Sequence, residues 1–331
     1  MSNAETAPDE VELARPPDPG CVEVVPPREV PLGGPRAMLV RRTLPMRGRA
    51  MIGAWCFVDH YGPDRVAETA GMVVAPHPHT GLQTLSWLFE GEIRHRDSAG
   101  NQALVRPGEV NLMTAGAGIS HSEVSTSGTD VLHGVQLWIA LPDHARHTAA
   151  GFEHHAPEAV RGPGWQARVL LGSLLGATSP VHTFSPLVGA EVLVAAGARL
   201  QISLDPTFEH GFLLDVGRVE LDGVEVKPGE LGYLASGRDS VEVRAVDESR
   251  LMVLGGEPFG ESIVMWWNFI GRTHQEIVDF RDQWQAQVIV NGALVADGQL
   301  VAPGRFGTVV NESLAPLPAP ALPNVRLRQR R

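Results

Sequence analysis

The sequence predicts an all-β protein made of two similar antiparallel domains, with short helices of which one lies near the C-terminus. A chain of 331 residues is too long for one ordinary core and suggests two domains. Short apolar stretches separated by glycine turns run through most of it, as in residues 85–89 before Gly91. The same order of strands and turns returns in the second half, which indicates a duplicated fold.

Composition divides the chain into four predicted parts. Residues 1–37 are rich in Pro, Glu and Asp with few apolar clusters, which predicts a flexible arm. Strand patterns begin at Met38, and a histidine-containing linker after Leu141 separates the two repeats. We therefore expect a first domain over residues 38–178, a second over residues 179–310, and an extended Pro- and Arg-rich tail over residues 311–331.

Two pairs of potential metal ligands stand out in the first domain. His77 and His79 are two residues apart, as are His121 and Glu123, and both pairs lie in strand-like segments next to glycine turns. Side chains alternate along a strand, so each pair points to one face, and two adjacent strands would bring four ligands together. A single His-x-His pair is more often solvent-facing or hydrogen-bonded. The presence of both pairs favours a metal site.

The ligand types indicate the kind of metal site. Three imidazoles and one carboxylate suit a borderline divalent ion, and iron(II) sites of this kind keep positions open for substrate and dioxygen. A closed structural zinc site usually uses cysteine, so the set leans toward catalysis or ligand binding. The chain's two cysteines, Cys21 and Cys56, are expected to be reduced thiols.

Other histidines are interpreted as structural. His60 precedes a turn and can bond to backbone there, and His95 lies on a polar strand face, although either could line a pocket beside the metal. A later cluster invites a second metal site, but its Ala, Gly and charged neighbours favour a surface linker; it comprises His144, His147, His154 and His155.

The second repeat keeps the strand rhythm and changes the ligands. Residues 208–217 repeat the strand before Gly91, and the turn at residues 227–230 repeats the one at residues 107–109. Counting back from Gly217 as from Gly91 places Ser203 and Asp205 where the first repeat has His77 and His79. We therefore expect the second domain to have no metal ligands.

The C-terminal region predicts one amphipathic helix. Thr273-x-x-Glu276 is a capping box, and Ile277, Phe280 and Trp284 follow on one helical face. The apolar residues just before it could form a binding platform, but such a run is more often core; they are Met265, Trp266, Trp267 and Phe269.

Charge and hydropathy exclude several partners. The net charge of −11 repels phosphate backbones, so direct nucleic-acid binding is disfavoured. No apolar run is long enough to cross a membrane and the first ten residues are polar and acidic, so we expect a cytoplasmic protein without a secretory signal. The 27 basic residues include one lysine, Lys227, an imbalance that suggests a GC-rich bacterial coding sequence.

These motifs carry a family resemblance. The order His77-x-His79, strand, Gly91, Pro107-Gly108-Glu109 and His121 resembles the two-part signature of the cupin barrels. The usual cupin glutamate would fall at Gln83 or Thr84, and the carboxylate appears at Glu123 instead. That rearrangement, within the segments HPHTGLQT and TAGAGISHSE, is similar to the pirin family in particular. Further similar landmarks are residues 57–63, 136–138, 256–258 and 267–269.

The resemblance implies a fold and a function. It implies two tandem cupin-like barrels, a bicupin, with one divalent metal on His77, His79, His121 and Glu123. Iron(II) is the first choice, and nickel, manganese, copper or zinc suit the same ligands. It implies a quercetin 2,3-dioxygenase-type activity on a phenolic substrate and dioxygen, with Glu123 as ligand and general base. The alternative is a non-enzymatic metal-binding regulator of a transcription factor or metabolic enzyme.

Overall fold

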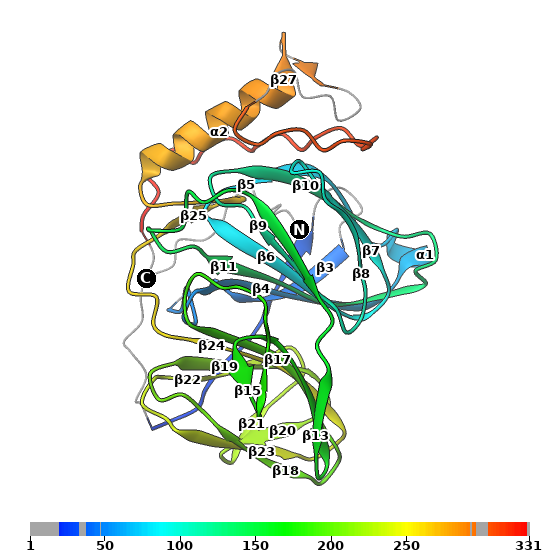
Figure 1. The fold of residues 1–331 in the computed structure, drawn as a ribbon, viewed down its shortest axis with the longest axis vertical. Coiled ribbons are helices and arrows are strands. Elements are labelled where there is room, and N and C mark those ends of the chain that lie inside the picture. The colour runs from blue at the N-terminus through cyan, green and yellow to red at the C-terminus, as the bar shows by residue number, and fades with distance from the viewer. Residues whose placement is uncertain (1–19, 33–37, 47, 292, 296–303, 330–331) are drawn as a thin grey trace.

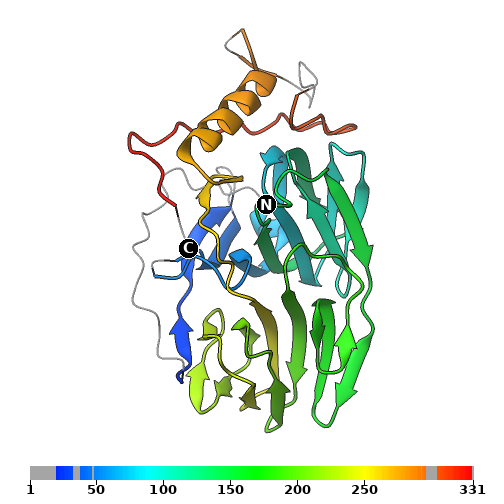
Figure 2. The same ribbon diagram turned by 60° about the vertical axis from the view of Figure 1, so that its left-hand side comes forward.

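A computed structural model describes residues 20–32, 38–46, 48–291, 293–295 and 304–329. Two β-domains lie one above the other, and helix α2 with the C-terminal segment crosses the far end of the first domain (Figures 1 and 2). Each domain pairs a seven-stranded sheet with a four-stranded sheet, and all strand pairings within them are antiparallel. The predicted all-β, two-cupin architecture with few helices is confirmed.

The first domain surrounds the predicted metal ligands. Its large sheet has the order β12-β9-β6-β11-β4-β3-β2. The strands are β12 Gly151–His155, β9 Val110–Thr114, β6 Leu82–Glu90, β11 Val131–Ala140, β4 Trp55–Arg65, β3 Met38–Leu44 and β2 Arg28–Leu32. The small sheet has the order β5-β10-β7-β8. These are β5 Val73–His79, β10 Ile119–Ser125, β7 Ile93–Asp97 and β8 Gln102–Val105.

The second domain repeats this arrangement. Its large sheet, β1-β22-β19-β24-β17-β14-β13, matches the first strand for strand, and its small sheet is β18-β23-β20-β21. The large sheet comprises β1 Glu23–Val25, β22 Leu231–Leu234, β19 Glu209–Val216, β24 Ser249–Gly256, β17 Leu187–Val194, β14 Trp165–Leu171 and β13 Ala159–Gly162. The small sheet comprises β18 Arg199–Ser203, β23 Ser240–Ala245, β20 Val219–Leu221 and β21 Val224–Val226. The predicted duplication therefore extends to the order of the strands.

The two interiors differ in chemistry. Strands β18 and β23 correspond to β5 and β10, and in the second domain their buried paired residues are aliphatic: Leu200 faces Val243, and Ile202 faces Val241. They belong to one continuous apolar cluster that fills the second barrel. The equivalent strands of the first barrel bury histidines and a glutamate instead.

The two domains pack through their large sheets. Leucine, valine and tryptophan side chains from both sheets form one buried cluster, with Leu85 and Leu137 on one side and Leu213 and Leu254 on the other. The indole Nε1 of Trp55 lies 3.2 Å from the carbonyl oxygen of Val188 in the second domain and donates to it. Burial of this face stabilises the pair by the hydrophobic effect.

The chain then returns from the second domain to the first. A hairpin of β25 Val264–Trp266 and β26 Phe269–Gly271 leads into α2, His274–Val288. Thr273 caps the helix as predicted, its hydroxyl accepting the N–H of Glu276, and Ile277, Phe280 and Trp284 are buried. The remaining short elements are α1 Val66–Thr69, β15 Ser173–Leu174, β16 Ala177–Thr178, β27 Ile289–Val290 and β28 Ala293–Leu294.

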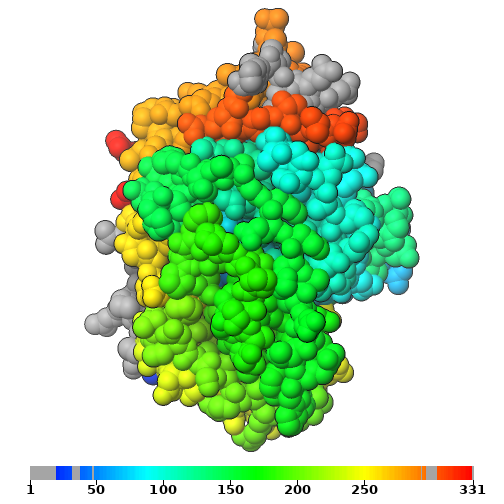
Figure 3. Space-filling model, viewed as in Figure 1, coloured from blue at the N-terminus to red at the C-terminus, as the bar shows by residue number. Residues whose placement is uncertain are grey.

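The tail crosses the small sheet of the first domain. The N–H of Leu317 donates to the carbonyl of Pro76 on β5, and Trp284 Nε1 of α2 donates to the carbonyl of Leu317. Glu312 accepts the Ser122 hydroxyl of β10 at 2.7 Å. In the space-filling view the orange-red tail lies directly on the cyan part of the first domain (Figure 3).

The structure differs in three places from the predicted organisation. Residues 23–25 and 28–32, expected in a flexible arm, form β1 and β2 and extend one large sheet each. Strands β13 and β14, expected in the first domain, join the second sheet beside β17. Helix α2, expected with the second domain, shares its buried cluster with the β25–β26 hairpin and the tail. The rest of the predicted arm, residues 1–19 and 33–37, and residues 330–331 of the tail lie outside the described residues.

Candidate metal centre

Strand β10 lies between β5 and β7 and places one group of histidines inside the first barrel. His121 pairs with His77 of β5 on one side and Asp97 of β7 on the other. The register shifts between His121 and Glu123, because Glu123 pairs with Val74. This irregularity re-aims side chains, as β-bulges beside active sites commonly do.

Three imidazoles converge in this interior. One ligand nitrogen from each of His77, His79 and His121 lies within 4.8 Å of the other two, and all three residues are 0% exposed. The Nε2 atoms of His79 and His121 are 3.1 Å apart. Two nitrogens that bind one ion at about 2.1 Å, with angles of roughly 90–109°, lie roughly 3.0–3.4 Å apart. The observed separation therefore fits a shared ion.

Hydrogen bonds on the far side of two rings fix their orientation. Nδ1 of His77 lies 2.9 Å from the carbonyl oxygen of Ala75, and Nδ1 of His79 lies 3.1 Å from that of Asn268. Each Nδ1–H donates to its carbonyl, which leaves the Nε2 lone pair directed inward, as in metal-bound histidines. Nε2 of His77 is buried and has no hydrogen-bond partner among the described residues. An orphaned lone pair of this kind fits a metal ligand.

The protonation states suit a cation. Burial lowers the pKa of His77 to about 3. Burial and the neighbouring imidazoles hold the pKa values of His79 and His121 well below their usual range. All three rings are therefore neutral at neutral pH, and each offers a lone pair.

The carbonyl that orients His79 comes from the hairpin beyond the second domain. Asn268 lies between β25 and β26, where Trp267 has a positive φ of 52°. Gly81, just after β5, allows the hairpin to approach: a Cβ there would lie 2.5 Å from the carbonyl oxygen of Ile270. A side chain at position 81 would displace the hairpin from the site.

Glu123 lies beside His121 and His95. One ligand atom of each of these three residues lies within 4.8 Å of the others, and Glu123 is 2% exposed. The carboxylate thus neighbours the three imidazoles through His121 and forms its close group with His121 and His95, whereas His77 and His79 belong to the other group. His95 has its Nδ1 3.4 Å from Nδ1 of His121 and its Nε2 3.3 Å from Asp97 Oδ2.

A serine and a glutamine orient the carboxylate. Ser86 Oγ is 3.0 Å from Glu123 Oε1 and 2.6 Å from the side-chain amide of Gln136. One hydroxyl donates one hydrogen, and Gln136 Nε2 otherwise has no partner in the part of the chain that is described. We therefore assign the amide with its N–H toward Ser86, which leaves the Ser86 O–H to donate to Glu123.

An apolar wall lies on one side of the imidazoles. The rings of His79 and Trp138 meet edge to face at 5.1 Å, and Trp138 stacks on Phe57 at 4.1 Å. The same buried cluster includes Met51 and Met113. These buried side chains make one side of the imidazole group apolar.

The structure brings most of the predicted ligands together and adds one residue. His77, His79 and His121 meet as expected, and Glu123 is next to His121 within the same interior. His95 lies within hydrogen-bonding reach of His121 and next to Glu123, whereas the sequence favoured a structural role for it on a polar strand face. The sequence feature that could have identified His95 is the spacing His95-x-Asp97. This spacing places both residues on the inward face of β7, next to β10.

His60 belongs to a different cluster at the domain interface. Its Nε2 lies 2.7 Å from Asp215 Oδ1 of the second domain, and His133 Nε2 lies 2.6 Å from the same oxygen. Arg41 donates to Nδ1 of His60, and Arg250 donates to the other oxygen of Asp215. Two guanidinium groups this close oppose a metal cation, so the cluster is an ion-pair and hydrogen-bond node between domains. A structural role was expected for His60, but its hydrogen bond to Asp215 of the second domain was not.

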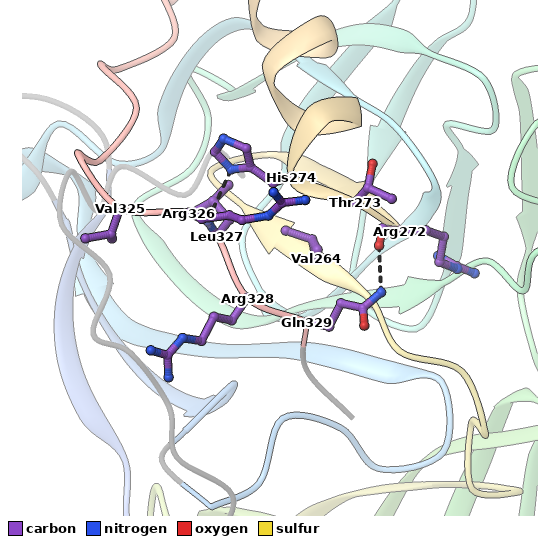
Figure 4. A pocket seen from close by; sticks show the side chains of 9 residues that line it. All are labelled: Val264, Arg272, Thr273, His274, Val325, Arg326, Leu327, Arg328 and Gln329. Carbon is purple, nitrogen blue, oxygen red and sulfur yellow. Dashed lines mark hydrogen bonds between the residues drawn. The ribbon is translucent and has the colours of Figure 1, made fainter.

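Within the described part of the chain, the later histidines and the tail form no comparable centre. His154 and His155 lie on edge strand β12, where His154 bonds to the side chain of Asn111. A cavity of about 610 Å³ lies between the tail and the start of α2 (Figure 4). Its arginines do not converge: Arg272 pairs with Glu261, and Arg272 and Arg328 extend to opposite sides.

Two family models match the chain. One, described as Pirin, covers residues 37–139, and the other, described as Pirin C-terminal cupin domain, covers residues 189–290. The chain belongs to the pirin family. Among curated pirin relatives is a Pseudomonas aeruginosa protein named "Putative quercetin 2,3-dioxygenase PA1205", 44% identical over 263 residues, which are 78% of this chain and 82% of the relative.

Further pirin relatives agree with this assignment. A pirin-like protein of Caulobacter vibrioides is 37% identical over 258 residues, 75% of this chain and 88% of its own length. The crystal structure of quercetin 2,3-dioxygenase from Acinetobacter baumannii superposes with a TM-score of 0.83 at 39% identity, covering 92% of this chain and 97% of that one. Of the helices in the described part of this pirin, none has the length and apolar character needed to cross a membrane.

Proposed function

We propose that this pirin is a metal-dependent dioxygenase that opens the ring of a flavonol, a quercetin 2,3-dioxygenase-type oxidoreductase. One divalent ion per chain, with iron(II) as the first choice, would be held by His77, His79, His121 and Glu123. The observation that carries the proposal is the buried convergence of three neutral imidazoles around an orphaned Nε2. The names of relatives at 39–44% identity support the reaction class.

The carboxylate supplies the proton chemistry. When bound, the ion would polarise the hydroxy-ketone oxygens of the substrate for reaction with dioxygen. Glu123 accepts the proton of the flavonol 3-hydroxyl, and the Ser86 hydroxyl holds the carboxylate in one orientation for that transfer. The burial of the imidazoles and of Glu123 keeps bulk water away from the deprotonated substrate.

The apolar wall suits the rest of the substrate. Trp138 and Phe57 form a stacked, buried aromatic pair beside His79, so a flat phenolic ring system held at the metal would have an apolar neighbour on that side. Small phenolic substrate and dioxygen are thus the proposed partners.

Oxygen uptake with quercetin tests the proposal. Protein loaded in turn with iron(II), nickel, manganese, copper and zinc is assayed on an oxygen electrode together with the loss of flavonol absorbance. We expect turnover with at least one metal and a fall in kcat of roughly 10²–10⁴-fold for Glu123→Gln. Glu90→Gln, an exposed glutamate of the same domain, should leave kcat unchanged. Metal bound without oxygen uptake for all five ions would refute the proposal and favour a regulatory protein.

A further inference from the structure

His121 differs from the other two imidazoles of the centre in what it meets on its far side. Nδ1 of His77 and Nδ1 of His79 each face a backbone carbonyl, whereas Nδ1 of His121 lies 3.4 Å from Nδ1 of His95. A carbonyl oxygen can only accept a hydrogen bond, but an imidazole nitrogen can donate or accept according to its tautomer. The position of the lone pair on His121 therefore depends on His95.

His95 in turn meets a buried carboxylate. Its Nε2 lies 3.3 Å from Oδ2 of Asp97, and the two residues are 3% and 1% exposed. The strand register places both beside β10, with His95 opposite Glu123 and Asp97 opposite His121. The ring of Phe152 lies against His95, with 5.0 Å between the ring centres. His95 is thus enclosed, and each of its two nitrogens has a polar partner.

The two oxygens of Asp97 have different partners. Oδ1 accepts the backbone N–H groups of Ala99 and Asn101 at 2.9 and 3.0 Å, which holds the turn between β7 and β8. Oδ2 accepts the side-chain amide of Asn101 and faces Nε2 of His95. Burial alone would raise the pKa of Asp97, but hydrogen bonds from His95 and Asn101 hold it below its usual value. An ionised carboxylate has no hydrogen to donate, so the hydrogen of this contact is on His95.

One assignment of hydrogens satisfies every contact in this row of side chains. With its hydrogen on Nε2, a neutral His95 presents the lone pair of Nδ1 to His121, which then donates its own Nδ1–H. That tautomer of His121 has its lone pair on Nε2, 3.1 Å from Nε2 of His79. Nε2 of His79 also has a lone pair, because the Nδ1–H of that ring donates to Asn268. Two lone pairs at this distance repel each other unless a cation lies between them.

His95 is a partner of the ligand and not a further ligand of the same ion. Nε2 of His121 faces His79, and the nitrogen on the other side of the ring, Nδ1, faces His95. Metal-bound histidines commonly donate their second N–H to a fixed acceptor, which orients the ring and makes the ligand nitrogen more basic. His95 takes this place for His121, as the carbonyls of Ala75 and Asn268 do for the other two rings.

We propose that Asp97 and His95 form a positioning relay for His121. The carboxylate fixes the hydrogen of His95 on Nε2, and His95 fixes the hydrogen of His121 on Nδ1, so that the Nε2 lone pair of His121 is directed to the ion. This inference rests on the metal site of the proposed function and not on the flavonol reaction. Because the relay acts through His121, its loss weakens metal binding directly and affects catalysis only through the bound metal.

The affinity of the full chain for nickel(II), measured by calorimetric competition with a chelator, tests the relay without any substrate. In Asp97→Asn the amide oxygen stays with the two backbone N–H groups, so the amide N–H faces Nε2 of His95 and reverses the direction of the hydrogen bonds. We expect nickel binding to be about 10–100-fold weaker in Asp97→Asn and in His95→Leu. His95→Gln, whose amide accepts and donates at once, should bind nickel more tightly than His95→Leu.

Asp205→Asn is the matched control. Asp205 is a turn residue of the second domain whose Oδ1 also accepts the backbone N–H two residues further on, at 2.9 Å. The control makes the same chemical change in a similar turn outside the relay. Asp205→Asn should therefore bind nickel like wild type.

NMR of the imidazole nitrogens gives a readout that a purely structural role of His95 would not change. In protein loaded with zinc, which is diamagnetic, His95 should carry its hydrogen on Nε2 in wild type and on Nδ1 in Asp97→Asn. The wild-type spectrum alone decides the tautomer should a variant not fold. Unchanged nickel affinity in Asp97→Asn or His95→Leu, or a hydrogen on Nδ1 of His95 in wild type, would overturn the relay. Nickel binding that follows these expectations without flavonol turnover would support the relay and refute only the dioxygenase.

Discussion

Replacing Asp215 by alanine should destabilise the whole molecule, because this carboxylate joins the two domains. Its side chain is 1% exposed and accepts hydrogen bonds from His60 and His133 of the first domain. Arg250 of the second domain donates to its other oxygen at 3.1 Å. Burial alone would raise the pKa of Asp215, but the hydrogen bonds from the two histidines hold it well below its usual value.

The size of the effect follows from what the substitution leaves behind. Removing one member of a buried charged network typically destabilises by about 3–5 kcal/mol, because its partners stay buried without compensation. Arg250 is 27% exposed on its side chain and keeps Glu191 as a neighbour at 3.5 Å, so most of the loss arises at the two imidazoles. At about 2 °C per kcal/mol, the expected fall in Tm is roughly 6–10 °C.

Thermal unfolding followed by calorimetry and circular dichroism measures this change. Asp247→Ala is the matched control, because Asp247 also pairs with an arginine at 2.7 Å in the same domain, but with its side chain 51% exposed. Exposed pairs contribute about 0–1 kcal/mol, so the control should shift Tm by at most about 2 °C. A fall in Tm for Asp215→Ala no larger than that of Asp247→Ala would refute the reasoning.

The same variant predicts a pH dependence. A carboxylate with a lowered folded-state pKa stabilises the protein fully above its unfolded-state pKa of about 3.9, and this contribution is lost as the pH falls below that value. The Tm difference between wild type and Asp215→Ala should therefore be constant from about pH 5 upward and shrink below about pH 4. A difference that persists undiminished at pH 3 would contradict the ion-pair origin.

Three more predictions concern the metal centre and the tail. Ser86→Ala should lower kcat for quercetin by roughly ten- to a hundredfold with little change in KM, and Ser86→Thr should restore it, because only the hydroxyl that orients Glu123 is at issue. Glu312→Ala, which releases the tail from Ser122, should lower the free energy of unfolding by about 1–2 kcal/mol in urea titrations. Removing the metal with a chelator should lower Tm, and adding iron(II) back at 100 times its Kd should restore about 2.7 kcal/mol; equal Tm values with and without metal would argue against the site.

The class of the fold and its duplication could be predicted because both appear as patterns within short segments of the sequence. Glycine turns between short apolar strands recur in each half, and the buried strands repeat accordingly. The positions of β1, β13 and β14 could not be predicted in the same way. Strand β1 has three residues, too few for a visible alternation, and its partner β22 lies about 200 residues away in sequence. Such a strand is defined by its tertiary partner and not by its own composition.

The candidate site was predictable to the extent that it depends on alternation along a strand. The spacing of His77 and His79 places both rings inside the barrel, and His121 follows from the neighbouring strand. The register shift before Glu123 and the carbonyl of Asn268, which reaches His79 from the hairpin beyond the second domain, depend on contacts between distant segments. No pattern within a single segment reports them.

The first barrel has a polar centre and the second has an apolar interior. This difference explains why the metal centre needs the whole chain. Burying three imidazoles and a carboxylate is unfavourable, and the first barrel offsets it with apolar clusters on either side and with an outer sheet face that the second domain covers. Without the second domain, that face would expose Leu85, Trp87 and Leu137 to water. The second barrel has an apolar interior and buries no comparable group of imidazoles among its described residues, so it can serve as the stable support. A duplicated fold of this kind can therefore keep a polar centre in one copy because the other copy stabilises the sheet that carries it.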